Sequence, residues 1–145
     1  MTMEEKIIHF DGADKTGKDT IRDLIVKHSQ GKYLIYVRSY ISQLVYSRLY
    51  ERYIDEYFFW KRMKEDYDKG DRFFYFTCDL EKVRQRFIDH NEQDLSIDDY
   101  EKHQKIFQDV VLEAKHHGIH IDWISTSTLS VEETAEQIKK LINKR

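Results

Sequence analysis

The sequence predicts a three-layer α/β fold, in which a parallel sheet of about four strands is covered by helices on both faces. Three observations support this prediction. Four short apolar runs alternate with longer stretches whose apolar residues recur every three or four positions. Strands that alternate with helices form parallel sheets covered on both faces. The chain has 145 residues and contains no repeat, low-complexity segment or linker, so we expect a single domain over residues 1–145.

The first half of the chain predicts two strands and two helical stretches. The apolar run Lys6–Asp11 stops at Gly12, as a buried parallel strand does. Apolar residues at helical spacing predict a helix over Lys18–His28, and the β-branched and aromatic run Tyr33–Val37 predicts the second strand. The stretch Ser42–Lys69 contains neither glycine nor proline, and its mixed spacings predict one long helix or two helices with a bend.

The second half predicts two further strands, Arg72–Thr77 and Ile119–Ile124, and three helices. One helix is expected over Leu80–His90. The stretches 96–117 and 130–143 each begin with a serine that is followed three residues later by Asp or Glu, the capping box that opens many helices. Ligands of such sheets bind beyond the carboxyl ends of the strands, so the residues that follow the four strands are candidates for a site.

Composition excludes several classes of protein. The net charge of −3 argues against broad binding to nucleic acid or to anionic membranes, and no apolar stretch is long enough to cross a membrane. The first ten residues are acidic and lack the order of a signal peptide, so we expect a cytoplasmic protein. The single cysteine, Cys78, is predicted to be a buried, reduced thiol. No histidine spacing suits a metal site, and neither order nor context suggests a Cys–His or Ser–His–Asp arrangement.

Residues Gly12–Lys18 match the pattern G-x-x-x-x-G-K between a predicted strand and a predicted helix. Glycines allow the backbone to turn tightly, and the N–H groups at the start of a helix can surround a phosphate. Lys18 would supply positive charge to the β- and γ-phosphates. The pattern predicts binding of a nucleoside triphosphate; a glycine turn with an exposed lysine is the alternative.

Asp19 occupies the position at which such loops usually place a serine or threonine on Mg²⁺, and Thr20 follows it. A carboxylate beside phosphates is repulsive unless a metal ion lies between them. Asp19 is therefore predicted to be a direct or water-mediated ligand of Mg²⁺. The alternative is a loop that no longer performs catalysis.

The segment Phe10–Lys18 (FDGADKTGK) resembles the F-E-G-x-D-x-x-G-K loop of thymidylate kinases, and its continuation is similar to the loop of phage-type deoxynucleoside monophosphate kinases. The resemblance implies a fold like that of P-loop NTP hydrolases, with ATP and Mg²⁺ as cofactors. Asp14 matches the aspartate that contacts the acceptor sugar in that family, with stabilisation of the turn as the alternative role. The residues implied to contact ATP are Gly12, Ala13, Asp14, Lys15, Thr16, Gly17, Lys18, Asp19, Thr20 and Thr126.

The residues that follow the second predicted strand align without gaps on the family's D-R-Y-x-x-S-x-x-A-Y segment. Arg38 matches the arginine that bridges the donor and acceptor phosphates, so the resemblance implies a catalytic and substrate-binding role for it. Val37 replaces the aspartate that helps to hold the metal in the family, and we hypothesise that Asp19 compensates for this loss. Tyr40 and Tyr46 lie nearest the presumed site and are predicted substrate residues that could stack on a base.

Residues 74–86 are similar to the family's third-strand segment, which leads into a lid over the triphosphate. We expect the lid at about residues 84–98, where Arg84 and Arg86 would shield developing charge. The alternative is that both arginines are solvated charges on a helix. The residues after the last predicted strand also follow the family, and the loop Thr126–Thr128 would border the adenine.

One block of the family is missing from this chain. It falls between the first predicted helix and the strand before Arg38, where the longer thymidylate kinases carry a proline-containing strand end and helices that grip the acceptor base. This chain contains no proline, and the acceptor base is left open. The stretch 42–69 holds more aromatic rings than one helix face needs, and most of them should form core or a homodimer interface.

These patterns predict a small nucleoside monophosphate kinase that transfers the γ-phosphoryl group of ATP to a thymidylate-like or modified pyrimidine (deoxy)nucleotide. A variant within this class would act on a nucleic-acid end, which the acidic balance disfavours. The alternative from another class is a nucleotide-binding or regulatory protein that kept the loop and lost turnover. Val37, Asp19 and the missing block favour this alternative, whereas Lys18, Arg38 and Asp14 count against it. Other P-loop chemistry is the third alternative.

Overall fold

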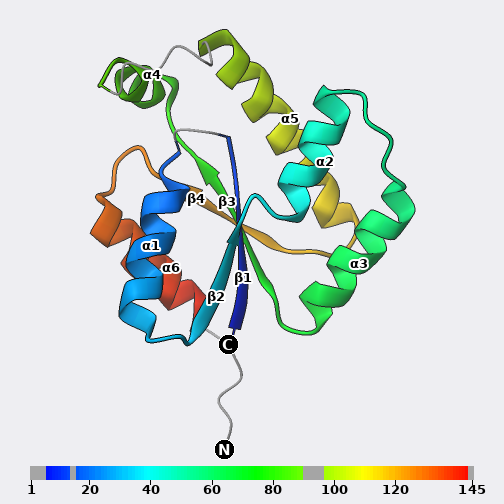
Figure 1. Cartoon of the computed structure of the whole chain (residues 1–145), viewed down its shortest axis with the longest axis horizontal. Helices are drawn as coiled ribbons and strands as arrows, with labels where there is room; N and C mark the ends of the chain where they lie inside the picture. Colours follow the sequence, from blue (N-terminus) through cyan, green and yellow to red (C-terminus); the bar gives the residue numbers. More distant parts are fainter. Residues whose placement is uncertain (1–5, 14–15, 90–96, 144–145) are drawn as a thin grey trace, which may run out of the picture.

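The computed structural model describes residues 6–13, 16–89 and 97–143. Its centre is a four-stranded sheet in which all strands run parallel, in the order β2-β1-β3-β4 (Figure 1). The predicted α/β fold with a parallel sheet of four strands is confirmed. The strands are β1 (Lys6–Asp11), β2 (Tyr33–Val37), β3 (Arg72–Thr77) and β4 (Ile121–Ser125). The helices are α1 (Lys18–Ser29), α2 (Tyr40–Leu49), α3 (Glu56–Asp68), α4 (Leu80–Asp89), α5 (Ile97–His116) and α6 (Val131–Ile142).

Helices cover both faces of the sheet (Figure 1). On one face, Ile8 and Phe10 of β1 pack with apolar residues of α1 and α6 in a single buried cluster. On the other face, α2, α3 and α5 bury a second cluster that includes Met63, Tyr75 and Phe107. Successive side chains of a strand point to opposite faces, so burial of Ile8 and Phe10 on the first face places the polar residues of β1 on the second.

Three of the four strands have the predicted bounds, but β4 begins two residues later than predicted. The cause is the end of α5. Gly118 has a φ of 74°, and the N–H of Ile119 donates to the carbonyl of Ala114 at 3.1 Å. Ile119 therefore closes the helix through a left-handed glycine cap, and its backbone is not available to the sheet.

The aromatic stretch 42–69 forms two helices, the second of the two predicted alternatives. The chain breaks after α2 although it lacks glycine and proline there. Glu51 takes up a left-handed conformation with a φ of 52°, and the N–H of Arg52 donates to the carbonyl of Ser47 at 2.8 Å. Asp55 then caps α3 by accepting a hydrogen bond from the N–H of Phe58 at 3.4 Å.

The capping box predicted at Ser130 is confirmed. The hydroxyl of Ser130 accepts from the N–H of Glu133 at 3.1 Å, and the carboxylate of Glu133 accepts from the N–H of Ser130 at 3.2 Å. The box predicted at Ser96 lies outside the described residues. Among those residues, no helix has the length and apolar character that crossing a membrane requires.

Candidate functional site

The predicted phosphate loop joins β1 to α1 at the carboxyl edge of the sheet (Figure 1). Gly12 has a φ of 156°, and a Cβ atom added there would meet the carbonyl oxygen of Phe76 at 2.7 Å. The loop therefore passes so close to β3 that only glycine fits at this position. Gly17 precedes α1 in a left-handed conformation with a φ of 87°. Because Gly17 has no side chain, it cannot cap the first N–H groups of the helix. In phosphate loops the N–H groups at a helix start bind the phosphate instead.

Two side chains of the loop converge on one carbonyl group. The hydroxyl of Thr16 donates to the carbonyl of Ala13 at 2.9 Å, and the ammonium group of Lys18 donates to the same oxygen at 3.2 Å. Both side chains are buried. Lys18 thus lies folded over the loop, the place from which a phosphate-binding lysine acts. Asp14 and Lys15, also predicted to contact ATP, lie outside the described residues.

Asp11, the last residue of β1, is a part of the site that we did not single out from the sequence. It is buried, and its Oδ1 atom accepts from the N–H of Ser39 at 2.9 Å, from the N–H of Ser42 at 3.0 Å and from the hydroxyl of Ser42 at 2.5 Å. Burial raises the pKa of Asp11, and the hydrogen bonds from Ser42 and Ser39 oppose this rise. The carboxylate caps α2 in place of its own N-cap side chain and ties that helix to the phosphate loop.

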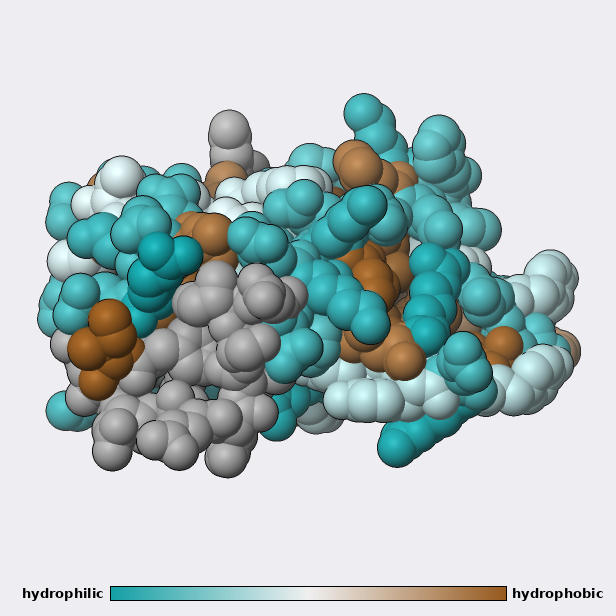
Figure 2. All heavy atoms as spheres, turned by 90° about the horizontal axis from the view of Figure 1, so that it is seen from above, coloured by the Kyte–Doolittle hydropathy of each residue, from teal (hydrophilic) through white to brown (hydrophobic). Residues whose placement is uncertain are grey.

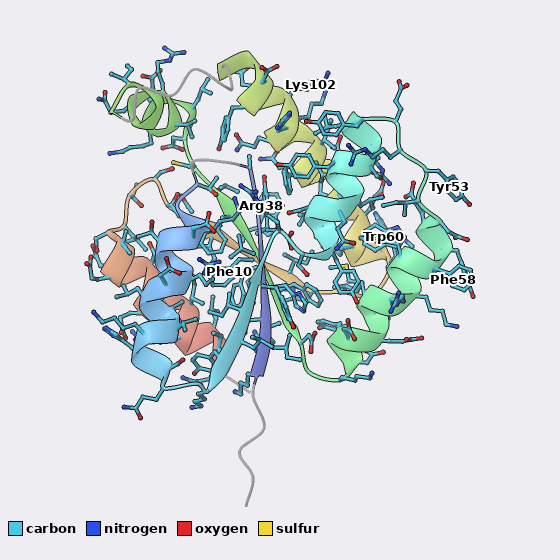
Figure 3. The ribbon with its side chains drawn as sticks, viewed as in Figure 1. Phe10, Arg38, Tyr53, Phe58, Trp60 and Lys102 are labelled. Carbon is cyan, nitrogen blue, oxygen red and sulfur yellow. The ribbon has the colours of Figure 1, made fainter. Side chains whose placement is uncertain are left out.

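Arg38 follows β2 at the same edge of the sheet, and Figure 3 shows it between α1 and α2. Its N–H donates to the carbonyl of Phe10 at 3.0 Å, which continues the pairing of β2 with β1 by one residue. Its φ is 65°, a left-handed value that is uncommon for a residue with a side chain. Conformations of this kind persist where surrounding contacts enforce them. Here the N–H of Arg38 is bonded to Phe10 and the N–H of the next residue, Ser39, is bonded to Asp11.

A Ser–His–Asp chain lies beneath this edge, an arrangement that we did not predict from the sequence. Nδ1 of His9 is 2.5 Å from the hydroxyl of Ser39, and Nε2 of His9 is 2.8 Å from the carboxylate of Asp71. His9 is buried and stacks on Phe73 with ring centroids 4.5 Å apart. A signal was present in the sequence: His9 and Asp11 alternate with apolar residues in a buried strand, so both must find polar partners on one face.

Asp19, the predicted metal ligand, lies exposed in the first turn of α1, and Thr20 is exposed beside it. The carboxylate of Asp19 is 3.8 Å from the guanidinium group of Arg22, one turn along the helix. In the described part of the chain, no group of three or more His, Cys, Asp or Glu side chains could hold a metal ion. Mg²⁺ is commonly held by one or two carboxylates together with phosphate oxygens and water, so a single carboxylate beside the loop fits this ion.

The structure separates the two tyrosines that we predicted to bind substrate. Tyr40 donates a hydrogen bond to Asp66 on α3, and burial together with this bond raises its pKa to about 12. Tyr46 instead packs edge-on against Phe107 and His103 of α5. The two rings thus pack against different helices.

The predicted lid falls mostly on α4 and on residues 90–96, which lie outside the described residues. Arg84 is exposed on α4, and its guanidinium group is 3.4 Å from the carboxylate of Glu81. α4 itself stands above the carboxyl edge of the sheet and packs against α5 (Figure 1). Arg86 lies on the same helix, but its side chain is outside the described part of the structure.

Thr126 belongs to the loop after β4, at the carboxyl edge of the sheet. Its N–H and its hydroxyl both donate to the carbonyl of Thr77, at 2.9 and 3.2 Å. Ser127 accepts from the N–H of Asp79 at 2.7 Å, so the loops after β3 and β4 are bonded to each other. Figure 2 shows this end of the molecule, whose described surface is mostly hydrophilic with scattered hydrophobic residues.

Comparison with known proteins supports the fold. No protein-family model and no curated protein sequence matches the chain. Among solved structures, the YorR protein from Bacillus subtilis, crystallised in complex with phosphorylated GDP, is similar with a TM-score of 0.79 and a sequence identity of 16%. The match covers 94% of this chain and 95% of YorR, so the likeness concerns the whole fold and not the phosphate loop alone.

Proposed function

We propose that this protein is an ATP-dependent kinase of nucleoside monophosphates. The observation that carries the proposal is the junction of β1 and α1. There a glycine loop with a buried lysine folded over it lies beside Arg38, and Asp11 joins the two parts. Phosphoryl transfer needs mainly positioning and stabilisation of charge, and these residues are of the types that supply both.

In this proposal the triphosphate of ATP lies over Gly12–Thr20, and Lys18 exchanges its bond to the carbonyl of Ala13 for the β- and γ-phosphates. Arg38 bridges the donor and acceptor phosphates. Arg84 and Arg86 of α4 approach from the lid, and the Thr126 loop borders the adenine. Asp14 contacts the acceptor sugar, and Tyr40 and Tyr46 remain candidates for contacts with the acceptor base.

Asp19 is the residue that would hold Mg²⁺ in this proposal. Its carboxylate is exposed at the first turn of α1, and its contact with Arg22 at 3.8 Å is a loose surface ion pair. Such a pair costs little to break, because exposed ion pairs contribute about 0–1 kcal/mol. The ion, when bound, would neutralise charge on the phosphate oxygens that lie beside this carboxylate.

The acceptor nucleotide is proposed only as a class. The sequence favours a thymidylate-like or modified pyrimidine nucleotide. YorR was crystallised with phosphorylated GDP, so guanine nucleotides belong among the compounds to be tested.

The second candidate is a nucleotide-binding or regulatory protein without turnover. Two observations favour it. Val37 ends β2 without a carboxylate, and the one carboxylate on the first turn of α1 contacts Arg22. The two candidates share the phosphate loop and differ in whether an acceptor is phosphorylated.

The experiment that tests the proposal is ADP release from ATP and Mg²⁺ with a panel of acceptors. The panel holds ribo- and deoxynucleoside monophosphates, including guanine nucleotides and pyrimidines modified at C5. Lys18→Ala and Arg38→Ala should each lower the acceptor-dependent rate at least about 100-fold, the loss typical of a group that stabilises transition-state charge. Lys27→Ala, an exposed lysine in the last turn of α1, is the matched control and should keep the rate.

Two results would decide against parts of this proposal. If no acceptor raises ADP formation above the Lys18→Ala background while ATP still raises the melting temperature, the binding protein is the correct alternative. If Asp19→Ser leaves the Mg²⁺ dependence of the rate unchanged, Asp19 is not the metal ligand.

We also propose a homodimer through the outer side of α2, α3 and their connection. Four aromatic side chains are exposed on this segment, and Figure 3 shows Tyr53 and Phe58 on its outer side while Trp60 points back into the molecule. They are Tyr50, Tyr53, Tyr57 and Phe58. Exposed aromatic groups of this density are typical of protein interfaces.

A further inference from the structure

A cavity of about 910 Å³ opens beside β2, on the face of the sheet that α2 and α3 cover. It extends from the start of α2 to the last turns of α3 and the first residues of β1 and β3. Pockets that bind small molecules have volumes of about 300–1,000 Å³, so this cavity is large enough for a ligand of the size of a nucleotide.

The cavity does not include the phosphate loop, although its end at Ser39 approaches Asp11, to which the N–H of Ser39 donates at 2.9 Å. Lys6, the first residue of β1, lines it, whereas the loop follows Asp11, the last residue of the same strand. Five residue steps of about 3.3 Å each place these two ends about 17 Å apart. Among the described residues that line the cavity, none belongs to Gly12–Thr20. A ligand here would therefore be a second ligand and not the donor nucleotide.

The charges on the cavity wall favour an anion. Four basic and two acidic side chains line it, in a chain whose net charge is −3. They are Lys6, Arg62, Lys69, Arg72, Asp66 and Asp71. Asp71 is hydrogen-bonded to His9, and Arg72 is ion-paired with Asp122 at 3.3 Å, so one charge of each sign is already engaged. This leaves three basic residues and one acidic residue among the charged lining residues. Phosphate and carboxylate groups are the anions that Arg and Lys side chains recognise.

An aromatic row favours a planar ring as the second part of the ligand. Phe73 stacks on His9 at 4.5 Å, and His9 stacks on Tyr36 at 5.6 Å with 24° between the rings. The row ends at Tyr36, which lines the cavity and is 48% exposed. Tyr36 thus offers an aromatic surface beside the cavity, and an added ring would gain stacking energy there.

Polar groups for the edge of such a ring lie on the opposite wall. Gln43 on α2 is exposed at the cavity, and its amide group can both donate and accept. Asp66 on α3 accepts from the hydroxyl of Tyr40 and keeps further lone pairs for a ring N–H group. Hydrogen-bond partners, an aromatic surface and positive charge therefore meet in one cavity.

We propose that this cavity binds a nucleoside monophosphate, with the base against Tyr36 and the phosphate beside Arg62 and Lys69. This inference rests on the proposed function for the role of the bound nucleotide, because Tyr40, a candidate contact for the acceptor base, lines the cavity. None of the described lining residues belongs to Gly12–Thr20, so binding to the cavity can be measured without the phosphate loop.

The test uses the full chain with Lys18→Ala and Arg38→Ala combined, which removes the proposed phosphate-loop site. AMP and GMP are titrated into it by calorimetry. We expect at least one of them to bind with one equivalent per chain. Tyr36→Ala and Arg62→Gln, each added to this protein, should weaken binding at least about tenfold, which corresponds to 1.4 kcal/mol. The controls Leu34→Ala, on the same strand, and Lys61→Gln, on the same helix, should leave the affinity unchanged.

Two results would overturn the proposal: neither nucleotide binds to the combined variant, or binding survives both Tyr36→Ala and Arg62→Gln. The side chains of Tyr36 and Arg62 are both exposed, so their replacement should not disturb the core. Circular dichroism should therefore show intact helices in each variant. Failure of the proposed kinase function is read separately. It appears as absence of acceptor-dependent ADP release in the wild type. Binding of AMP or GMP to the combined variant can be observed whether or not the wild type releases ADP.

Discussion

Asp11 joins two parts of the chain that lie far apart in the sequence. Its carboxylate accepts from the backbone of Ser39, 28 residues away, and from Ser42. The chain after β2 therefore approaches the phosphate loop because a buried carboxylate needs partners. Because Arg38 immediately precedes Ser39, its left-handed conformation depends on the same bonds.

The raised pKa of Asp11 predicts how stability depends on pH. Because the folded state holds the proton more tightly than the unfolded state, Asp11 contributes stability below the ordinary carboxyl pKa of about 3.9, and this contribution is lost as the pH rises through the raised value. Asp11→Asn keeps the oxygen acceptor but removes the titration. Urea unfolding should show the wild type gaining stability relative to Asp11→Asn as the pH falls through the range just above the ordinary carboxyl pKa, toward about 4.

The control for this prediction is Asp23→Asn, an exposed carboxylate on α1. It is measured over the same pH range and shows how much pH dependence a surface Asp→Asn substitution introduces. If the difference between Asp11→Asn and the wild type varies no more than this, or has the opposite slope, burial does not dominate the titration of Asp11.

At the scale of elements, the phosphate loop passes close to β3. A methyl group at position 12 would lie 2.7 Å from the carbonyl oxygen of Phe76, which is backbone and cannot swing away. Gly12→Ala should therefore lower the free energy of unfolding through two contributions, strain at the positive φ and this clash. The clash should add about 1–3 kcal/mol to the loss that the strain causes by itself. It should also abolish the rise in melting temperature that ATP produces, because the loop must move off β3.

Gly70→Ala separates the two contributions. Gly70 has a φ of 114°, but nothing lies within 4 Å of an added Cβ atom, so the substitution introduces strain without a clash. Equal losses of stability in urea unfolding for Gly12→Ala and Gly70→Ala would show that the contact with Phe76 is unimportant.

The connection between α2 and α3 shows why element bounds are hard to predict here. No glycine or proline marks the break, since a non-glycine residue, Glu51, adopts the left-handed conformation. The stop comes from the bond of Arg52 to Ser47 and the start from the Asp55 cap. Only the second of these is a local pattern that the sequence displays.

For the whole molecule, the exposed aromatic segment predicts self-association. Tyr53 and Phe58 are 89% and 55% exposed, which is unusual for a surface that contacts only water. Sedimentation velocity over a range of concentrations should show a dimer of the wild type. Replacement of both residues by serine should weaken the dimer at least about tenfold, because aromatic anchors carry much of an interface's energy.

Val26→Ser provides the control, since Val26 is an exposed apolar residue on α1, away from the segment. It should leave the dimer unchanged. A wild type that stays monomeric at every concentration would show that the aromatic segment has another use.

The sequence by itself determined the fold class, three strands with their bounds, the final capping box and the position of the glycine loop between β1 and α1, whose binding of phosphate stays a prediction. These depend on local patterns: apolar runs, helical spacing and glycines between a strand and a helix. Tertiary structure decided how buried polar groups are satisfied. The partners of Asp11, His9, Tyr40 and Tyr46 and the cavity beside β2 all involve residues distant in the chain. A strand pattern tells that a polar side chain is buried, but only the packing of other elements against it determines which groups it bonds.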